Sequence, residues 1–461
     1  MDLNIIIAGA GKVGTTLAEH LADEGHSVTV IDIRDEILTK VSDQLDVMCT
    51  KGNRASQAVL REANVAAADI LIAATNSDEI NILCCHCAHQ MSAAYTVARV
   101  RSTEYMSDVQ VLKNDLGINM IINPEFATAE EISRLLRFPS AANIDTFARG
   151  QVEIVSFRVQ ERDGLSGRAL SSLSSRIREL PILFCAAERD GEVYIPDGSF
   201  VPALGDKMYA AGTPAGIHQL FRLLGRDNHK VRSVFIIGGG RIAYYLLDIL
   251  THLGMDCKVV ERSELRCRQL SESFPRCLVI HGDGTDPELL TEERMTSNDA
   301  FVALTDRDED NLIISLYAHQ NGVPKVVAKS SRQNYASIAR SAGLDSVVSP
   351  KLTTAYQILR TVRGIQNSKG SVMNALYKIA DGHAEAMEFV AGPTTHYLGV
   401  PLKSLRLKKG FLIAVIVRAG RIIIPEGSTS LQEGDTAIVV AKDSGIMDLN
   451  AIYADPFGIG G

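Results

Sequence analysis

An internal repeat constrains this chain more than any other feature, because two related halves must fold into two related units. Residues 69–79, with the sequence DILIAATNSDE, recur as DAFVALTDRDE at residues 299–309, an offset of 230. The same offset carries Asn81 onto Asn311, and residues 195–199 recur as residues 424–428 at an offset of 229. Offsets this steady across the chain indicate a tandem duplication.

Each half begins with short apolar strands that alternate with amphipathic helices, a pattern typical of a doubly wound parallel α/β sheet. After about residue 138 the pattern changes to short strands separated by turns, which predicts a small α+β domain. The predicted fold is therefore two Rossmann-like sheets, each followed by a small α+β domain. In the first sheet the expected strands cover residues 4–8, 27–32, 46–50, 70–74, 95–99 and 119–122.

Four segments follow from this alternation. The Rossmann-like lobes are expected at residues 1–138 and 227–364, and the small lobes at residues 139–226 and 365–461. The sequence GIQNSKG at residues 364–370 is rich in small and polar residues, which predicts a linker before the last segment.

The first half carries the glycine fingerprint of dinucleotide-binding folds. The run GAGKVG at residues 9–14 follows an apolar strand and precedes a helix expected over residues 15–23, the context that this otherwise weak motif requires. Gly9 would permit a tight turn, Gly11 would let the backbone approach a pyrophosphate, and Gly14 would let the helix pack closely on the strand. The alternative is that the glycines serve only the turn. The remaining residues of the predicted phosphate loop are Ala10, Lys12 and Val13.

Asp32 closes the second expected strand, 23 residues after Gly9. Its carboxylate is placed to accept hydrogen bonds from the adenosine ribose hydroxyls, each worth ~1.5–3 kcal/mol. The same charge would repel a 2′-phosphate. The sequence therefore favours NAD(H), or another nucleotide with an unphosphorylated ribose such as ATP, over NADP(H).

The second half carries an altered copy of the fingerprint, GGGRIA at residues 238–243, with Glu261 again 23 residues after the first glycine. Ala243 at the third glycine position is an accepted variant. We expect a second nucleotide here, with a degenerate structural copy as the alternative. The predicted contacts are Gly238, Gly239, Gly240, Arg241, Ile242 and Glu261.

Further candidate ligand contacts lie at the carboxyl ends of the third, fourth and fifth strands, because open α/β sheets bind ligands at that edge. Polar residues after the fourth strands can contact a ligand or cap the next helix. A cation after the fifth strand can meet a phosphate or a surface carboxylate, and Arg101 is an alternative to the first of these cations. Residues after the third strands are expected on the adenine side. The candidates are Gly52, Asn53, Thr75, Asn76 and Arg99 in the first half, and Gly282, Asp283, Thr305, Asp306 and Lys329 in the second.

Two kinds of site are not predicted. Cys84, Cys85, His86, Cys87 and His89 suggest a metal cluster. On a helix, however, Cys84 and Cys87 share one face while Cys85 and His89 share another, and the second half has no thiols at the matching positions. A buried helix face is the preferred interpretation, without a metal. No acid–base group stands at a spacing that suggests catalysis, so no catalytic residue is predicted.

Composition adds limits on the partners. The net charge of −8 gives no whole-surface attraction to nucleic acid, although a local basic patch remains compatible with it. Eight cysteines without a disulfide-like framework, and a start that leads straight into a strand, indicate the reducing cytosol. No stretch approaches the roughly 18 apolar residues that cross a bilayer, so work at a membrane would need a partner.

The doubled order resembles the TrkA family, the peripheral subunits of Trk potassium-uptake systems, over nearly the whole chain. In that family each half has an RCK (KTN) nucleotide-binding lobe and an RCK C-terminal lobe. The resemblance rests on the two glycine runs with Asp32 and Glu261, on Thr75-Asn76 and Arg99, and on the IPDG and IPEG runs at residues 195–198 and 424–427. Asn53, where an Asp is frequent, and Ala243 depart from the family pattern.

The resemblance implies a regulatory role rather than a reaction. Such proteins are similar to gating rings: they assemble as homo-oligomers, here a tetrameric ring, on an integral membrane Trk-type potassium channel subunit. They change shape with bound NAD(H), ATP or ADP. The implied location is the cytoplasm, at the inner face of the plasma membrane. The alternative function is a soluble NAD-dependent oxidoreductase with a duplicated cofactor fold.

Overall fold

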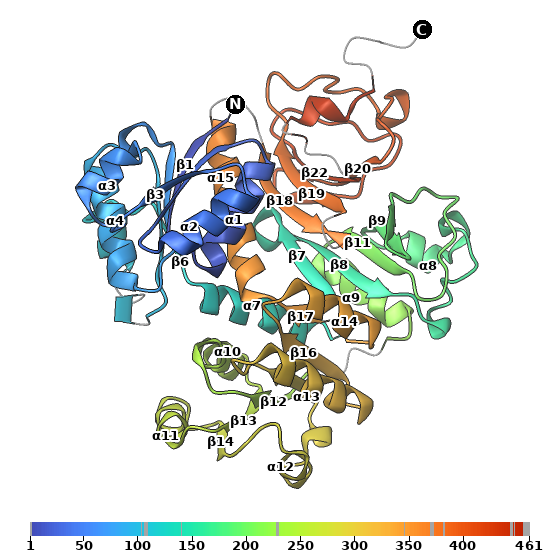
Figure 1. Cartoon of the computed structure of the whole chain (residues 1–461). Coiled ribbons are helices and arrows are strands. Elements are labelled where there is room, and N and C mark those ends of the chain that lie inside the picture. The colour runs from blue at the N-terminus through green and yellow to red at the C-terminus, as the bar shows by residue number, and fades with distance from the viewer. Residues whose placement is uncertain are drawn as a thin grey trace.

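The structure is a computed structural model, and it describes residues 2–102, 104–105, 109–139, 141–226, 230–344, 346–368, 373–380, 383–442, 446 and 448–454. Within these residues the chain forms two six-stranded parallel sheets and two five-stranded antiparallel sheets (Figure 1). They alternate along the chain, so the predicted class of two Rossmann-like sheets, each followed by a small α+β domain, is confirmed. The segment limits at residues 138, 226 and 364 stay a prediction.

The first parallel sheet has the order β3-β2-β1-β4-β5-β6. The central strands β2, β1 and β4 are buried on both faces, as a parallel sheet covered by helices requires, whereas the edge strand β3 is mostly exposed. The predicted strands are confirmed to within two residues at each end. They are β1 (Asn4–Ala8), β2 (Ser27–Asp32), β3 (Met48–Lys51), β4 (Ile70–Ala73), β5 (Thr96–Arg99) and β6 (Met120–Ile122).

Helices cover both faces of this sheet. The first of them, α1 (Lys12–Asp23), begins three residues before the predicted start, because Gly11 is extended and Lys12 is already helical. The end of the glycine run is therefore the first turn of the helix. The other helices of the lobe are α2 (Asp35–Gln44), α3 (Gln57–Glu62), α4 (Asp78–Gln90) and α6 (Val109–Asn114).

The second parallel sheet repeats the first in the order β14-β13-β12-β15-β16-β17. Its strands are β12 (Ser233–Ile237), β13 (Asp256–Glu261), β14 (Leu278–His281), β15 (Ala300–Ala303), β16 (Lys325–Lys329) and β17 (Val347–Val348). Its helices are α10 (Arg241–His252), α11 (Glu264–Ser273), α12 (Pro287–Glu292), α13 (Asp308–Gln320) and α14 (Gln333–Ser341).

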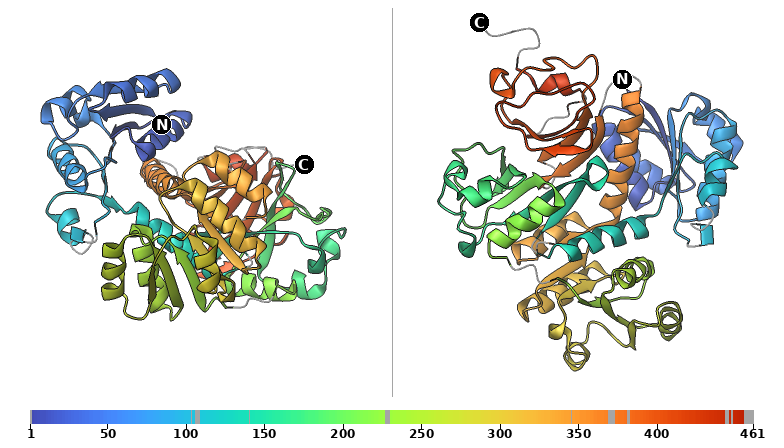
Figure 2. Two further views of the ribbon diagram at one scale, coloured as in Figure 1. Left: turned by 60° about the horizontal axis from the view of Figure 1, so that its bottom comes forward. Right: turned by 180° about the vertical axis from the view of Figure 1, so that it is seen from behind.

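The two halves exchange a helix. The helix α7 (Pro124–Arg137) follows the first sheet in sequence but packs on α10 of the second lobe, where Ile132 and Leu136 share a core with Leu246. Conversely, α15 (Pro350–Ser368) follows the second sheet and packs on α1 of the first lobe. Both Figure 1 and Figure 2 show α15, in orange, lying against the blue lobe.

The predicted linker at residues 364–370 is wrong over most of its length. Residues 364–368 form the last turn of α15, while residues 369 and 370 lie outside the described residues. The turn is helical because its neighbours anchor it: Val362 is buried against the first lobe, and Arg363 forms an ion pair with Glu24 after α1, with Nε and Oε2 3.0 Å apart. Small polar residues here end an exchanged helix rather than separate two domains.

The two antiparallel sheets have the orders β10-β9-β11-β8-β7 and β18-β19-β22-β20-β21. Apolar residues from one face of each sheet form a shared core. In the first, Asp206 is held by two hydrogen bonds from Arg189, 2.8 and 2.6 Å long, and in the second Asp435 is held in the same way by Arg418 at 2.8 Å. Asp206 and Asp435 therefore make the same arginine contact in the two small domains.

The bounds in the small domains are β7 (Asn143–Phe147), β8 (Val152–Arg158), α8 (Ser175–Arg178), β9 (Ile182–Arg189), β10 (Glu192–Tyr194), β11 (Lys207–Gly212), α9 (Pro214–Leu223), β18 (Met373–Ile379), β19 (Ala384–Val390), β20 (Phe411–Arg418), β21 (Arg421–Ile423) and β22 (Thr436–Lys442). In the described part of the chain, no helix combines the length and the apolar character needed to cross a bilayer.

Candidate nucleotide sites

The first glycine loop joins β1 to α1 at the carboxyl edge of the sheet. Gly9 has φ +118°, a conformation that favours glycine, and its N–H donates to the carbonyl of Ile31 at 2.8 Å. A Cβ on Gly14 would lie 1.8 Å from the Gly9 carbonyl oxygen, whereas a Cβ on Gly11 would meet nothing within 4 Å. Gly9 and Gly14 therefore make the turn, and Gly11 faces open space.

The first turn of α1 presents backbone N–H groups at this loop. The side chain of Lys12 is exposed, whereas that of Val13 is buried in the core of the lobe. Arg241 and Ile242 repeat this arrangement at the start of α10. Because the side chains of Val13 and Ile242 are buried, only their backbone N–H groups can face a ligand. Helix N-termini bind anions through such groups.

Asp32 ends β2 and lies directly under the loop. Its Oδ2 accepts the N–H of Ala10 at 2.8 Å, and its Oδ1 accepts the N–H of Arg34 at 3.0 Å. Burial alone would raise the pKa of Asp32, but the hydrogen bonds from Arg34 and Ala10 and the charge of Arg54 hold that pKa well below its ordinary value. The carboxylate is thus ionised at neutral pH.

Two arginines that the sequence reasoning missed surround this carboxylate. Arg34 Nε and Arg54 Nη2 both contact Asp32 Oδ1, at 3.2 and 3.1 Å. A comparison of the two halves could have drawn attention to them, because the second half has Ser263 and Gly284, not arginines, at the matching positions.

The second glycine loop repeats the first without the arginines. Gly238 has φ +92°, and a Cβ on Gly240 would meet nothing within 4 Å. The carboxylate of Glu261 accepts the N–H of Gly239 and the N–H of Ser263, both at 2.7 Å. The acid therefore has the same backbone partners as Asp32 in the first lobe.

A side chain of α11 lies over this second loop. Arg266 Nε donates to the carbonyl of Gly239 at 2.7 Å, and its guanidinium lies 5.8 Å from the ring centroid of Tyr244. The second lobe therefore carries a cation beside its glycine loop, although not beside Glu261. We call the surroundings of the acid in each lobe, Asp32 or Glu261, the ribose corner.

The residues after the third strands form matching turns. Asn53 Oδ1 accepts the N–H of Ala55 at 3.1 Å, and Asp283 Oδ1 accepts the N–H of Thr285 at 2.9 Å. Asp283 also pairs with Arg262 at 2.6 Å. A Cβ on Gly52 would lie 2.5 Å from Val59, and a Cβ on Gly282 would lie 2.7 Å from Leu289, so a side chain at either position would displace its neighbour.

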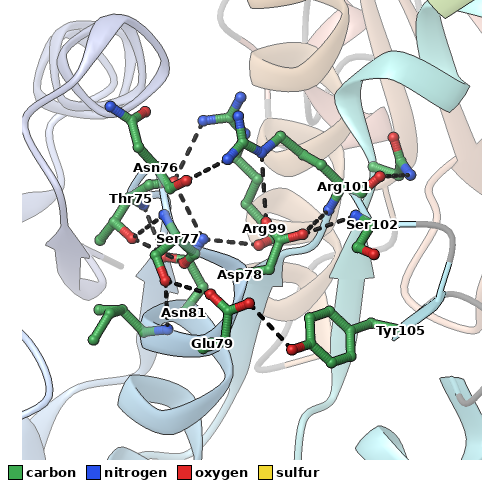
Figure 3. A network of polar contacts seen from close by, with 12 residues as sticks. Thr75, Asn76, Ser77, Asp78, Glu79, Asn81, Arg99, Arg101, Ser102 and Tyr105 are labelled. Atoms are coloured by element: carbon green, nitrogen blue, oxygen red, sulfur yellow. Dashed lines mark hydrogen bonds and ion pairs between the residues drawn. The ribbon is translucent and has the colours of Figure 1, made fainter. Parts of the chain in front are cut away.

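Thr75 and Asn76 lie after β4, in a polar network shown in Figure 3. The side chain of Asn81 holds this turn from below: it accepts the N–H of Thr75 at 2.8 Å and donates to the carbonyl of Arg99 at 2.8 Å. Asn311 does the same for Thr305 and Lys329. The repeated asparagine thus joins the ends of the fourth and fifth strands.

The helix-capping alternative for Thr75 and Asn76 is wrong, because Ser77 is the N-cap of α4 and accepts the N–H of Ile80 at 3.2 Å. Asp78 instead accepts the N–H groups of Arg101 and Ser102, both at 2.8 Å. The guanidinium of Arg101 donates to the carbonyl of Asn76 (Figure 3). Arg101 therefore fixes the loop rather than extending toward solvent.

The cations that end the fifth strands are largely buried. Arg99 Nη1 donates to the carbonyl of Thr75 at 3.4 Å, and its Nε is buried with no hydrogen-bond partner. Lys329 Nζ lies 3.9 Å from the carboxylate of Asp306. Burial lowers the pKa of Arg99 and of Lys329. Desolvation therefore disfavours the charged form of both side chains at the carboxyl edge of the sheet.

Two of the three cysteines of α4 lie on the buried side of the helix, as the sequence predicted, and Cys87 is half-buried. Cys84 and Cys85 are fully buried, and the thiol of Cys85 donates to the carbonyl of Val97 at 3.4 Å. His86 Nδ1 lies 3.2 Å from the carbonyl oxygen of Leu116.

Two family models match the chain. The TrkA-N domain matches residues 5–124 and again residues 234–350, and the TrkA-C domain matches residues 386–453. A relative called Trk system potassium uptake protein TrkA homolog 2, from Methanosarcina mazei, is 31% identical over 98% of this chain and 100% of its own length. The Trk system potassium uptake protein TrkA of Haemophilus influenzae is 32% identical over 96% of both chains.

Solved structures share the fold. A structure described as the GsuK channel bound to NAD superposes with a TM-score of 0.61 and 20% identity, covering 96% of this chain and 78% of that one. The crystal structure of the GsuK RCK domain gives a TM-score of 0.62 and 19% identity, covering 96% of this chain and 93% of that one.

Proposed function

This chain belongs to the TrkA family of Trk-system potassium-uptake proteins, and from that membership we propose that it is their nucleotide-binding regulatory subunit. It binds NAD(H), ATP or ADP and gates an integral membrane potassium channel subunit, working as a peripheral protein at the inner face of the plasma membrane. In this proposal it catalyses no reaction.

One observation carries the proposal: each half holds a glycine loop whose backbone is hydrogen-bonded to an acid at the end of the next strand. The Ala10 N–H reaches Asp32 at 2.8 Å, and the Gly239 N–H reaches Glu261 at 2.7 Å. The loop opens at Gly11 and Gly240, where no atom lies within 4 Å of a built Cβ. This arrangement supports a pyrophosphate at each helix N-terminus and an adenosine ribose beside each acid.

Hydrogen bonds between the two Rossmann-like lobes could couple the two nucleotide sites. The hydroxyl of Tyr245, on α10 of the second lobe, donates to the carbonyl of Arg101 at 3.1 Å and accepts from Asn123 at 2.9 Å. Arg101 in turn holds the carbonyl of Asn76 in the first site. A ligand that displaces this loop would therefore move a helix that begins at the second glycine loop.

Charges also act across the lobes. The positive charge of Arg241 contributes to the lowered pKa of Arg99, and that of Lys12 contributes to the lowered pKa of Lys329. Phosphates bound to one lobe would therefore be attracted by the cations of both lobes. A nucleotide shifts a two-state assembly only by binding one state better, and a change from 1:99 to 99:1 requires about 5.5 kcal/mol.

The resemblance to the family implies a homo-oligomeric, tetrameric ring, and each half has an exposed apolar residue at a matching position that is available for contacts between copies. Leu83 on α4 is 48% exposed, and Ile313 at the matching position of α13 is 66% exposed. The matching position is therefore apolar and exposed in both halves, so the same contact between copies could be made twice in each chain.

Two measurements on the full-length protein test the proposal. Calorimetry with NADH, NAD, ATP and ADP is expected to show binding of at least one nucleotide, and a pull-down from membranes is expected to recover a Trk-type potassium channel subunit. No affinity for any of the four nucleotides, or steady consumption of NADH with a panel of metabolites, would refute the regulatory role.

A further inference from the structure

The two ribose corners differ at two positions beside the acid. The backbone is the same in both, because Gly52 N–H donates to the carbonyl of Asp32 and Gly282 N–H to that of Glu261, each at 3.0 Å. On this shared frame the first corner carries Arg34 and Arg54. The matching residues of the second corner are Ser263 and Gly284.

In the first corner every acceptor position of the acid is already used. Asp32 Oδ1 accepts from Arg34 N at 3.0 Å, Arg34 Nε at 3.2 Å and Arg54 Nη2 at 3.1 Å. Its Oδ2 accepts from Ala10 N at 2.8 Å and Arg34 Nη2 at 3.5 Å. A carboxylate offers about four lone-pair positions, and the Asp32 side chain is only 1% exposed. A ribose hydroxyl therefore finds no free acceptor on Asp32.

In the second corner the acid keeps acceptors for a ligand. Glu261 uses one position on each oxygen, for the N–H groups of Gly239 and Ser263. The nearest arginine along the chain, Arg262, is paired with Asp283 at 2.6 Å instead. Two lone-pair positions of Glu261 remain for the 2′- and 3′-hydroxyls of a ribose.

The arginines change what the first corner presents. The side chain of Arg34 is 51% exposed, and Arg54 Nε is buried with no hydrogen-bond partner. One carboxylate and two guanidinium groups give this corner a formal charge of +1. A guanidinium offers a planar fork of donors that matches a phosphate, and an arginine near the ribose is how related folds accommodate a 2′-phosphate.

We propose that the first site selects an adenine nucleotide with a phosphate on the ribose 2′-oxygen, the class of NADP(H), and that the second site selects a free ribose. Asp32 is then a positioning residue for Arg34 and Arg54, and the repulsion expected from its charge is offset by them. This inference rests on the proposed nucleotide binding and assigns the two sites different ligands.

Calorimetry on the full-length protein tests the assignment. NADPH and NADH are each expected to bind one site per chain, without competing. Adenosine 2′,5′-bisphosphate is expected to bind more tightly than AMP, which lacks only the 2′-phosphate. Exchanging the corner residues through Arg34→Ser and Arg54→Gly is expected to weaken NADPH about 10- to 150-fold, the range of hydrogen bonds to a charged group, and to leave the NADH site unchanged.

A matched control removes the same two charges elsewhere. Arg176→Ser with Arg178→Gly, on the exposed surface of α8, is expected to leave NADPH affinity unchanged. If the exchanged protein does not fold, Arg54→Lys keeps the charge and removes the planar fork, and is expected to weaken NADPH while NADH binds as before.

The outcomes separate the two proposals. If neither dinucleotide nor ATP nor ADP binds, nucleotide regulation itself fails. If NADH binds and NADPH does not, or if NADPH affinity survives the loss of both arginines, the assignment of the first site is overturned while nucleotide regulation stands.

Discussion

At the third position of the first fingerprint, a Cβ built on Gly14 would lie 1.8 Å from the carbonyl oxygen of Gly9. The second loop holds Ala243 at the matching position, and that methyl group is fully buried. The two loops therefore differ in how closely the helix approaches the preceding turn, and the first is the tighter of the two.

Replacing Gly14 by alanine is therefore expected to open the first loop. Overpacking costs about 1–3 kcal/mol, and the displaced N–H groups should no longer meet a pyrophosphate, so one of the two nucleotide sites should be lost in calorimetry. Ala243→Gly is the matched control and should cost at most about 1 kcal/mol, the preference of a helix for alanine. Two intact sites in the Gly14 variant would contradict this account.

Burial raises the pKa of the thiols of Cys84 and Cys185 to about 12. Because only the thiolate reacts quickly, both should resist N-ethylmaleimide at neutral pH until the chain is unfolded. Cys49 is exposed and should be labelled first, which peptide mass spectrometry would show. Labelling of Cys84 before Cys49 would mean that α4 opens readily.

The sequence predicted the acids and glycines of both sites because their spacing is fixed by one strand–turn–helix frame. It did not reveal that Arg34 and Arg54 contact Asp32, since the direction of a long side chain depends on its tertiary neighbours. The sequence showed only that Asn81 recurs as Asn311. Its hydrogen bonds to the ends of two strands became apparent in the structure.

At the scale of elements, the exchanged helices join the halves. Ala355, Ile358, Leu359 and Val362 on one face of α15 are buried in the core of the first lobe. Amphipathic periodicity predicts that such a helix covers some sheet, but it does not say which one. For the same reason the small polar residues at its end were interpreted as a linker.

Truncating Leu359 to alanine is expected to destabilise the first lobe by about 2–5 kcal/mol, the usual cost of an emptied core position. Hydrogen exchange should rise in β1 and α1, far from residue 359 in sequence. Leu253→Ala, at a position 49% exposed, serves as the control and should change little. Exchange that rises only in the second lobe would rule out the helix exchange.

At the scale of the whole molecule, the proposed ring depends on surfaces that a single chain leaves open. Each half presents its apolar residue at the same place, Leu83 on α4 and Ile313 on α13, so one kind of contact can recur around a closed assembly. The resemblance to the family predicted assembly, whereas these residues could not be identified from periodicity alone.

Introducing glutamate at Leu83 and Ile313 together is expected to reduce the mass in light scattering from that of a tetramer toward one chain, because charges would be buried in each contact. Leu204→Glu, at a small-domain position 63% exposed, should leave the mass unchanged. An unaltered mass in the double variant would place the contacts on another surface.

The helix exchange also bears on how far the two halves of such a chain can differ. A half on its own would lack the helix that the other half supplies, because Ile358, Leu359 and Val362 of α15 fill part of the core beside α1. Because both halves lie in one polypeptide, each sheet always has the helix of the other half beside it. The two nucleotide sites of one chain can therefore differ in sequence while the helix exchange is kept, as they do at Arg54 and Gly284.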